Sequence, residues 1–419
     1  MLRVRALIFK PATATFNAPA LSKDIRVKSL YIHPIKSCKG TSVQEATYTH
    51  DGLCEDRTWL IIDAETKQFQ TARQLSRMLL IHPHIDFARG VLRIDVPLTE
   101  KGKGTISVET PLEPTEEQLS KMELVEGIKI WISEVDGYAV SKEADEALSE
   151  FFGRSVRLVR KGPTKRASGP DDRRNDPTLN FQDFYPILVA NQASIEHVRE
   201  TLMRSIWPSL SSKADTTKAV DSATSEARKE AGAGPVVTAP VGQAGLPSWG
   251  VPAIKAPNGV DLEYWSPEHI ETLPIIRFRP NILLESPDLL PWEEDGFTEL
   301  EIFDTASSSA NTPPYGASAI GAGRFGITCM ARCGRCLVTT IDPETGVKDK
   351  PSSSLPYKVL QGFRRVEPQS LKTGKPCFGM LSAIKDDQRG ERLGQTIRVG
   401  DTVRVVGAMD PRGRAATQK

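Results

Sequence analysis

The sequence predicts a mainly β chain with a few helices, in the α+β class. Short runs of β-branched and aromatic residues recur at close spacing and are separated by Gly, Pro and Asp, which is typical of antiparallel barrels and sandwiches. The chain has 419 residues, more than one ordinary domain, so two domains, or one domain with a large insertion, are expected.

The first unit is predicted to span residues 25–165. A helix is expected to start at Ser141, because the apolar residues that follow fall on one face, and Gly153 should stop it. The apolar face of this helix should close one end of the sheet. The strands expected in this unit are residues 25–32, 58–62, 68–71, 91–96, 105–108 and 128–133.

The second unit is predicted to span residues 176–408. A buried strand at 186–190 should lead into a helix capped by Asn191, whose apolar residues follow helical spacing. A short helix is expected at 356–363. The other strands expected in this unit are residues 275–285, 300–303, 336–341 and 397–405.

Three segments are expected to lie outside the packed units. Residues 209–259 contain few large apolar side chains, so burial cannot offset their ordering entropy, and a disordered insertion is predicted. Residues 305–323 are rich in Ser, Gly and Pro and should form a long loop. Residues 1–24 carry four basic residues and no acid before Asp24, so they are either a mitochondrial transit segment or a flexible terminus. The expected location is therefore mitochondrial or cytoplasmic.

Composition narrows the class of partner. Lys plus Arg number 54 and Asp plus Glu number 53, so no global basic field exists to hold a nucleic acid, and a small molecule is the expected partner. No run of about 18 apolar residues is present, so no transmembrane helix is expected. Of the six cysteines, three are clustered and three, Cys38, Cys54 and Cys377, are isolated. This pattern is unlike a secreted disulfide framework and favours a reducing compartment.

The clustered cysteines are the strongest chemical signal. Cys329, Cys333 and Cys336 lie within eight residues together with Arg332 and Arg335. Both arginines are expected to lower the thiol pKa values and favour the thiolate, which is the form that binds metals.

Several kinds of site fit such a run: an iron–sulfur cluster, half of a zinc site, a single ligand to a metal held in an organic cofactor, or buried thiols with only a packing role. Only 83 residues follow Cys336, whereas a cluster of the radical S-adenosylmethionine type precedes nearly all of its barrel. The six histidines and the other cysteines offer no second ligand pair at zinc-finger spacing.

Five segments together resemble one family. They are residues 31–40 (YIHPIKSCKG), 56–60 (DRTWL), 70–74 (QTARQ), 277–281 (RFRPN) and 333–346, which begins CGRC. In this order they are similar to the signatures of MOSC-domain proteins, in particular the branch of the mitochondrial amidoxime-reducing component. The resemblance runs from about Ile25 to Val405 and implies an N-terminal β-barrel domain followed by a MOSC β-barrel domain.

The resemblance also implies a molybdenum cofactor, in which a pterin dithiolene and one protein cysteine bind the metal. The matching metal ligand and catalytic residue is Cys336, and a soft thiolate suits such a metal. In the segment 182–186, Phe184 and Tyr185 stand where animal relatives carry small hydroxyl residues and could line the cofactor. The residues that the resemblance assigns to cofactor binding are Lys36, Ser37, Arg57, Arg279, Asn281, Gly334, Arg335 and Cys336.

The activity implied by this resemblance is reduction of N-hydroxylated compounds by removal of oxygen, with electrons from a separate donor such as a b-type cytochrome and its reductase. The alternative is a carrier of the cofactor, or a sulfur-handling protein, without reductase turnover. Metal content and turnover distinguish the two.

Overall fold

The computed structural model describes residues 24–98, 104–170, 172, 174, 176–210, 250–303, 324–367, 372–385 and 394–409. The predicted terminus up to residue 23, the predicted loop 305–323 and residues 211–249 of the predicted insertion lie outside the described residues. The last part of that insertion is described. Ile254 packs against a buried helical core and contacts Gly362, so the prediction of disorder is wrong for residues 250–259.

The larger sheet closes on itself as a barrel. Seven strands follow the order β13-β12-β16-β15-β14-β18-β1, and β1 pairs again with β13, while β2 extends the sheet beyond β1. Most pairs are antiparallel, with a parallel pair between β12 and β13. The strands are β1 (Ile25–Ile32), β2 (Thr41–Val43), β12 (Ile187–Asn191), β13 (Ile282–Glu285), β14 (Phe297–Phe303), β15 (Arg324–Gly334), β16 (Cys377–Ile384) and β18 (Thr402–Ala408).

The start of the first predicted unit belongs to this barrel in space. β1 pairs with β13 and β18, and Val27 and Leu30 enter the barrel core on either side of a shift in the register with β13. A small sheet, in the order β17-β3-β4, packs against the same core through Tyr48 and Ile397. Its strands are β3 (Glu45–Thr49), β4 (Gly52–Leu53) and β17 (Thr396–Arg398). Residues 25–53 are therefore divided from the rest of the predicted unit 25–165.

The remainder of the first domain is a curled pair of antiparallel sheets. One sheet has the order β5-β11-β10-β9 and the other β6-β7-β8. Helix α2 (Lys142–Phe152) buries Leu148 and Phe151 in the core between them, as the sequence predicted, with Ser141 as its N-cap and Gly153 at its end. The other elements are β5 (Trp59–Asp63), η1 (Ser76–Leu80), β6 (His82–Asp86), β7 (Val91–Pro97), β8 (Thr105–Pro111), α1 (Glu116–Lys121), β9 (Leu124–Ile130), β10 (Ser133–Ala139) and β11 (Val156–Lys161).

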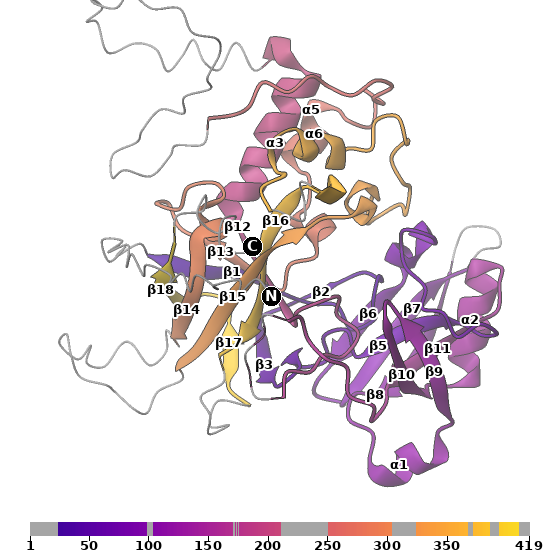
Figure 1. Ribbon diagram of the computed structural model, residues 1–419. Helices are drawn as coiled ribbons and strands as arrows, with labels where there is room; N and C mark the ends of the chain where they lie inside the picture. The colour runs from indigo at the N-terminus through magenta and orange to yellow at the C-terminus, as the bar shows by residue number, and fades with distance from the viewer. Residues whose placement is uncertain are drawn as a thin grey trace, which may run out of the picture.

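Helices cover one end of the barrel (Figure 1). They share a core around Trp265, Trp292 and Phe378. The helix predicted after Asn191 is confirmed as α3, and its N-cap side chain accepts a hydrogen bond from the Ala193 amide. None of the described helices is long and apolar enough to cross a bilayer. These elements are α3 (Gln192–Ile206), α5 (Pro267–Glu271), η2 (Ile275–Phe278), η3 (Glu293–Gly296), η5 (Leu337–Thr340) and α6 (Tyr357–Phe363).

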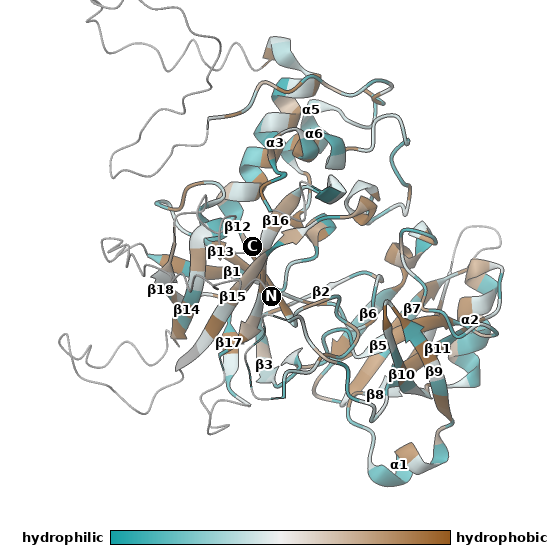
Figure 2. Ribbon diagram, viewed as in Figure 1, coloured by the Kyte–Doolittle hydropathy of each residue, from teal (hydrophilic) through white to brown (hydrophobic). Residues whose placement is uncertain are grey.

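Hydropathy follows the same arrangement (Figure 2). Apolar residues concentrate on the strands of both domains, whereas α2 turns a polar face outward. Burial of apolar surface within each domain is the main force that stabilises the two cores. The mainly β fold with two units is therefore as predicted.

Five predicted strands differ in detail. Residues 68–71 form no strand, and only the isolated bridges Ile62–Phe69 and Gln68–Lys129 occur there, because a run this short pairs at single positions. Residues 275–285 form the 3-10 helix η2 before β13, and residues 336–341 contain η5 instead of a strand. Residues 128–133 straddle the β9–β10 turn, and 397–405 divide into β17 and β18. Arg279, Trp131 and Gly400 have positive φ angles of 53°, 53° and 94°, and such residues interrupt the pleat. Periodicity of a short apolar run does not detect these breaks.

Candidate functional site

The predicted site residues lie in four loops where the barrel meets the first domain. Lys36 and Ser37 follow β1, Arg57 precedes β5, and Arg279 lies between η2 and β13. Cys336 lies between β15 and η5. We call the set Lys36, Ser37, Arg57, Arg279, Asn281, Gly334, Arg335 and Cys336 the cradle.

Hydrogen bonds join these loops directly. Arg57 Nη1 donates to Asn281 Oδ1 at 3.2 Å, and Arg57 Nη2 donates to the carbonyl of Arg279 at 3.3 Å. Asn281 Oδ1 also accepts from the Leu188 amide, and its Nδ2 donates to the Tyr31 carbonyl. The buried Asn281 amide therefore positions Arg57 relative to β1 and β12.

Three members of the cradle have strained backbones. Ser37, Arg57 and Arg279 have positive φ angles of 69°, 52° and 53°. Non-glycine residues seldom adopt this conformation, and it persists only where surrounding contacts enforce it, most often at functional sites. No local signal in the sequence predicts these angles, because none of the three residues is a glycine.

The cations of the cradle differ in their partners. Lys36 Nζ forms an ion pair with Asp183 at 2.6 Å and also donates to the Phe181 carbonyl. Arg57 pairs with the adjacent Asp56 carboxylate. Among the described residues, no carboxylate lies within ion-pair distance of Arg279 or Arg335.

Arg279 and Arg335 bind neutral groups instead of carboxylates. Arg279 Nη1 donates to the Cys38 carbonyl at 2.6 Å. Arg335 Nη2 donates to the Phe278 carbonyl at 2.7 Å, and its Nη1 donates to Cys333 Sγ at 2.8 Å. Arg279 Nη2 and Arg335 Nε are buried without a hydrogen-bond partner. Orphaned N–H groups on uncompensated cations suit an anion.

The clustered arginines change the pKa values of groups in and beside the cradle. Burial, and next the charge of Arg57, lower the pKa of Arg279 to about 10. Burial and the charges of Arg57, Arg279 and Arg335 hold the pKa of His33 well below its ordinary value. His33 is therefore neutral, and its Nε2 lies 3.2 Å from the Pro280 carbonyl. An anion placed among these groups would relieve the repulsion.

The cysteine run is divided between different environments. Cys329 is buried in the barrel core on β15, whereas Cys336 is half-buried on the loop after this strand. Within the described residues, the sulfur atoms of Cys329, Cys333 and Cys336 do not come within 4.8 Å of one another as a set. The three thiols are therefore not arranged to bind one metal ion together, and Cys329 is enclosed in the barrel core.

The expected effect of both arginines on the thiols is only partly realised. Arg332 is buried and pairs with Asp295 at 3.3 Å and Glu367 at 3.2 Å, so its charge is already compensated. Burial raises the pKa of Cys333, although Arg335 opposes this shift. The expectation that the arginines would lower this pKa is therefore wrong for Cys333, because desolvation of the thiolate is the larger effect.

Both domains match known protein families. Residues 24–155 match the model of the MOSC N-terminal beta barrel domain, and residues 253–404 match that of the MOSC domain. The chain is a MOSC-domain protein.

Several relatives are similar to this chain in sequence. Mouse mitochondrial amidoxime-reducing component 1 is 26% identical over 392 residues, covering 91% of this chain and 82% of the relative. Human mitochondrial amidoxime reducing component 2 is 25% identical, covering 90% and 82%. Bovine molybdenum cofactor sulfurase is 27% identical over 185 residues, covering 43% of this chain and 20% of the sulfurase. This MOSC protein is thus distantly related to both groups.

One acidic residue of this MOSC protein was missed by sequence reasoning. Asp183 accepts hydrogen bonds from Lys36 and from Trp131 Nε1, the latter at 3.1 Å. Desolvation favours the neutral form of Asp183, but the Lys36 ammonium and the Trp131 N–H hold the pKa of Asp183 below its ordinary value. Phe184, which was expected to line the site, is 58% exposed, and Tyr185 is buried with its ring against Gly169. Within this segment Asp183, and not Phe184 or Tyr185, contacts Lys36 of the cradle.

Buried Arg166 holds this segment in place. It donates from Nη1 to the Gln182 carbonyl at 2.5 Å and from Nη2 to the Asp183 carbonyl at 2.9 Å. Gln182 in turn donates to the Asp51 and Asp56 carbonyls. No sequence motif marks Arg166, because its role depends on a segment 16 residues away that returns beside it.

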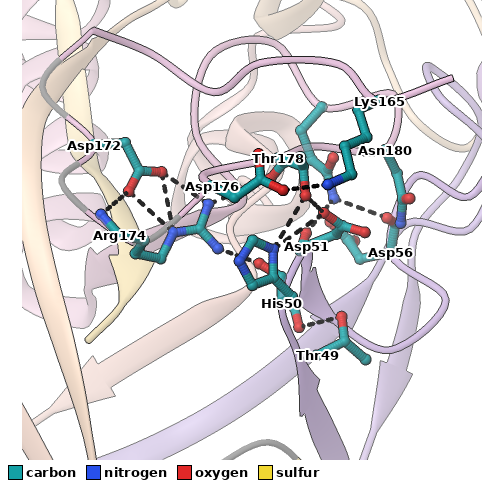
Figure 3. A network of polar contacts seen from close by, with 12 residues as sticks. Thr49, His50, Asp51, Asp56, Lys165, Asp172, Arg174, Asp176, Thr178 and Asn180 are labelled. Atoms are coloured by element: carbon teal, nitrogen blue, oxygen red, sulfur yellow. Dashed lines mark hydrogen bonds and ion pairs between the residues drawn. The ribbon is translucent and has the colours of Figure 1, made fainter. Parts of the chain in front are cut away.

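A polar network anchors the connection between the two domains (Figure 3). Arg174 pairs with Asp172 at 2.8 Å and donates to the carbonyls of His50 and Thr178. The Thr178 hydroxyl donates to Asp51 Oδ1 at 2.5 Å. The connection is thereby fixed to the β3–β4 turn, and this places Asp183 over the cradle.

The second missed residue is Tyr357 at the start of α6. Burial, and next the charge of Cys336, raise the pKa of Tyr357. The phenol is therefore protonated at neutral pH and lies within electrostatic reach of the Cys336 thiol. The sequence offered no signal for it, since the two residues are 21 positions apart.

Proposed function

We propose that this MOSC protein is a molybdenum-cofactor-dependent reductase of N-hydroxylated compounds. The observation that carries the proposal is the combination of a half-buried thiol, Cys336, with two guanidinium groups, half-buried Arg279 and buried Arg335, that each have one buried N–H without a partner and lack carboxylate partners among the described residues. A soft ligand beside an uncompensated anion site is what a metal in a phosphorylated organic cofactor requires.

Each member of the cradle has a distinct part in holding the cofactor. Cys336 supplies the thiolate ligand to molybdenum. Arg279 Nη2 and Arg335 Nε, which are orphaned, donate to the cofactor phosphate and polar edges. A Cβ atom at Gly334 would lie 3.8 Å from the nearest protein atom, Lys375 Cβ. The protein itself does not demand glycine there, and close approach of the cofactor explains it.

Bound molybdenum cofactor supplies the two-electron chemistry that removes an oxygen atom from nitrogen. Overall, the N–O bond breaks, nitrogen gains hydrogen, and the oxygen leaves as water with two electrons and two protons consumed. Tyr357 keeps its proton on Oη at neutral pH, as phenols ordinarily do, and its raised pKa extends this protonated form to higher pH. Neutral His33 adds no further positive charge beside the arginines.

Residues at the rim are suited to receive a small substrate. Asp183 has a side chain 57% exposed, and Trp131 is 41% exposed, with Arg73 lying 4.9 Å from its ring centroid. A carboxylate acceptor next to an aromatic side chain suits a planar nitrogen compound that carries N–H donors. N-hydroxylated amidines and related bases have this chemistry. The electrons are proposed to come from a separate donor protein, such as a b-type cytochrome with its reductase.

A carrier or sulfur-handling role is the second candidate. The similarity to bovine molybdenum cofactor sulfurase favours it, since the match covers 43% of this chain. A carrier needs the cradle and Cys336 but no access for a substrate. It would bind the cofactor with full occupancy and show no turnover.

The test combines metal analysis with turnover of the purified full-length chain. Molybdenum content is measured by mass spectrometry, and reduction of a simple N-hydroxylated amidine is followed with a reduced viologen dye as electron donor. Stoichiometric molybdenum with product formation supports the reductase. Stoichiometric molybdenum without product favours the carrier, and iron in place of molybdenum contradicts both.

Compartment is a separate proposal. The basic segment before Asp24 is proposed to act as a mitochondrial targeting segment, with a cytoplasmic location as the alternative. Fusion of residues 1–40 to a fluorescent protein tests it, with Arg3→Ala and Arg5→Ala together as the matched change. Mitochondrial fluorescence that these changes disperse supports targeting, and diffuse fluorescence of the unmodified fusion contradicts it.

A further inference from the structure

A second group of potential metal ligands lies outside the cradle. Cys54 and Glu55 follow β4, and Glu113 lies after β8 in the first domain. The Cys54 sulfur and one carboxylate oxygen from each glutamate all lie within 4.8 Å of one another. Cys54 was one of the isolated cysteines in the sequence, and the glutamate that approaches it is 59 positions away.

Glu55 points to a missing partner at this position. The residue is only 6% exposed, and its Oε2 is buried without a hydrogen-bond partner. Its Oε1 accepts from the Cys54 thiol at 3.7 Å, a long contact to sulfur. A buried carboxylate oxygen without a partner costs free energy, and native proteins normally satisfy such atoms with a proton, water or cation.

The charges around the group are unbalanced. With the Cys54 thiol deprotonated, the three ligands carry three negative charges. Arg160 is a nearby cation, and its charge favours the ionised form of Glu55. Arg160 Nη2 donates to the Leu112 carbonyl at 3.0 Å, beside Glu113. A divalent cation together with Arg160 would neutralise the three ligands.

Repulsion within the group is visible in its acid–base properties. Burial raises the pKa of Glu55 to about 7. The charge of Arg160 opposes this shift, and the charge of Glu113 adds to it. Burial and both glutamates raise the pKa of Cys54 to about 12. Metals displace protons from such ligands on binding, including from a thiol.

We propose that Cys54, Glu55 and Glu113 form a binding site for a divalent cation of zinc type. One thiolate with two carboxylates suits Zn²⁺, which accepts both sulfur and oxygen ligands, better than Mg²⁺ or Ca²⁺, which prefer oxygen alone. Glu113 is exposed, so the fourth position is open to water. The site is separate from the cradle and does not depend on the proposed reductase activity.

The position of the site suggests its role. It would connect the loop after β8 of the first domain to the turn that carries Asp56 and Arg57. Asp56 accepts a hydrogen bond from the His33 amide, and Arg57 donates to Asn281. A bound cation would therefore tie the first domain to the turn that presents Arg57.

Titration of the metal-free, full-length protein with Co²⁺ under reducing conditions tests the proposal. Cobalt replaces zinc in sulfur-containing sites and gives a thiolate-to-metal charge-transfer band. The wild-type chain should show this band, and Zn²⁺ should abolish it by competition. Cys336→Ser should retain the band, which separates this site from the cysteine run.

Three variants complete the test. Cys54→Ser should lose the band, and Glu113→Gln should weaken cobalt binding about tenfold or more. The matched control is Glu117→Gln, whose side chain is 79% exposed and forms an ion pair with Lys121; it should bind as the wild type does.

Three outcomes overturn the proposal: no charge-transfer band in the wild type, a band that persists in Cys54→Ser, or equal affinities in Glu113→Gln and Glu117→Gln. Circular dichroism of each variant verifies folding. Because Glu113 is exposed, its variant keeps the test decisive even if Cys54→Ser does not fold.

Discussion

Two regions of the molecule contain buried arginines. Carboxylates compensate the guanidinium charges in one region, whereas only neutral groups bind them in the other. Behind the cradle, fully buried Arg364 donates from Nη2 to both carboxylate oxygens of Asp295, at 2.7 and 3.0 Å, and lies 4.0 Å from the ring centroid of Trp292. Arg332 joins the same network through Asp295 and Glu367. In this region each guanidinium has a carboxylate.

In the cradle, Arg279 and Arg335 are bound by carbonyls and a sulfur atom, and each keeps an N–H group without a partner. Arg332 and Arg335 are three positions apart on the same segment, yet belong to different regions. Burial alone does not identify a ligand-binding arginine, and neither does the lack of a carboxylate, since buried Arg166 also binds only backbone carbonyls. The cradle differs because Arg279 and Arg335 gather with Arg57 around His33, an accumulation of positive charge that is costly unless a ligand neutralises it.

The largest effect is expected when the thiol is removed from the cradle while its cations remain. Cys336→Ala should lower turnover by at least about three orders of magnitude, because the molybdenum loses its protein ligand. Cys333→Ala should be much milder, since Cys333 contacts Arg335 and packs beside the site. Steady-state reduction and molybdenum content measure both. Equal losses in the two variants would contradict a single thiolate ligand.

The next effect is on stability, in the compensated network. Arg364→Met leaves Asp295 without its main partner in a buried environment, so the free energy of unfolding should fall by about 3 to 5 kcal/mol. Urea unfolding of the metal-free protein measures this. Arg365→Met, at the exposed neighbouring position, should change it by less than about 0.5 kcal/mol. A small loss in Arg364→Met would mean that the network is not structural.

The opposite pattern is expected for the uncompensated region. Arg279→Met removes a cation without a carboxylate partner, so the metal-free protein should keep its stability to within about 1 kcal/mol or become more stable. Cofactor affinity should fall about ten- to a hundredfold, since a charge-assisted hydrogen bond is lost. Molybdenum content after dialysis measures this, with Lys28→Met as a surface control. Full cofactor retention together with lowered stability in Arg279→Met would show that Arg279 is structural and does not bind the cofactor.

The smallest effect concerns pH in the compensated network. Burial and the adjacent charge of Asp295 raise the pKa of Glu294 to about 8. A carboxyl group with a raised folded pKa contributes stability below its unfolded pKa of about 4.5, and this is lost as pH rises through about 8. The free energy of unfolding should therefore fall with rising pH, by up to about 1.4 kcal/mol per pH unit.

Glu294→Gln should reduce this slope, because glutamine does not titrate. The Ser194 hydroxyl and the Asn191 amide, which donate to Glu294 Oε2, can still donate to the glutamine carbonyl oxygen. Urea unfolding between pH 5 and 9 compares the two proteins. An unchanged slope would show that Glu294 is ionised in the fold throughout this range.

Local patterns in the sequence predicted the regular elements. Alternation along residues 25–32 predicted β1, and helical spacing with Ser141 and Gly153 predicted α2, since both features arise within a few turns of chain. The 3-10 helices η2 and η5 were predicted as strands, because a short apolar run is compatible with either conformation. For η2, the positive φ angle of Arg279 decides the conformation, and only contacts with the surrounding structure enforce this angle.

The sequence by itself predicted the mainly β class from its short punctuated β-like runs, and its ordered motifs predicted the two MOSC units and singled out Cys336 and Arg335 as candidate site residues, because these features lie in the chain itself. Only the tertiary structure decided that Arg332 meets Asp295 while Arg335 does not, that Asp183 reaches Lys36, and that β1 closes the barrel of the second domain. The physical reason is that charge compensation and strand pairing depend on distances between segments far apart in the chain, and these distances exist only after folding.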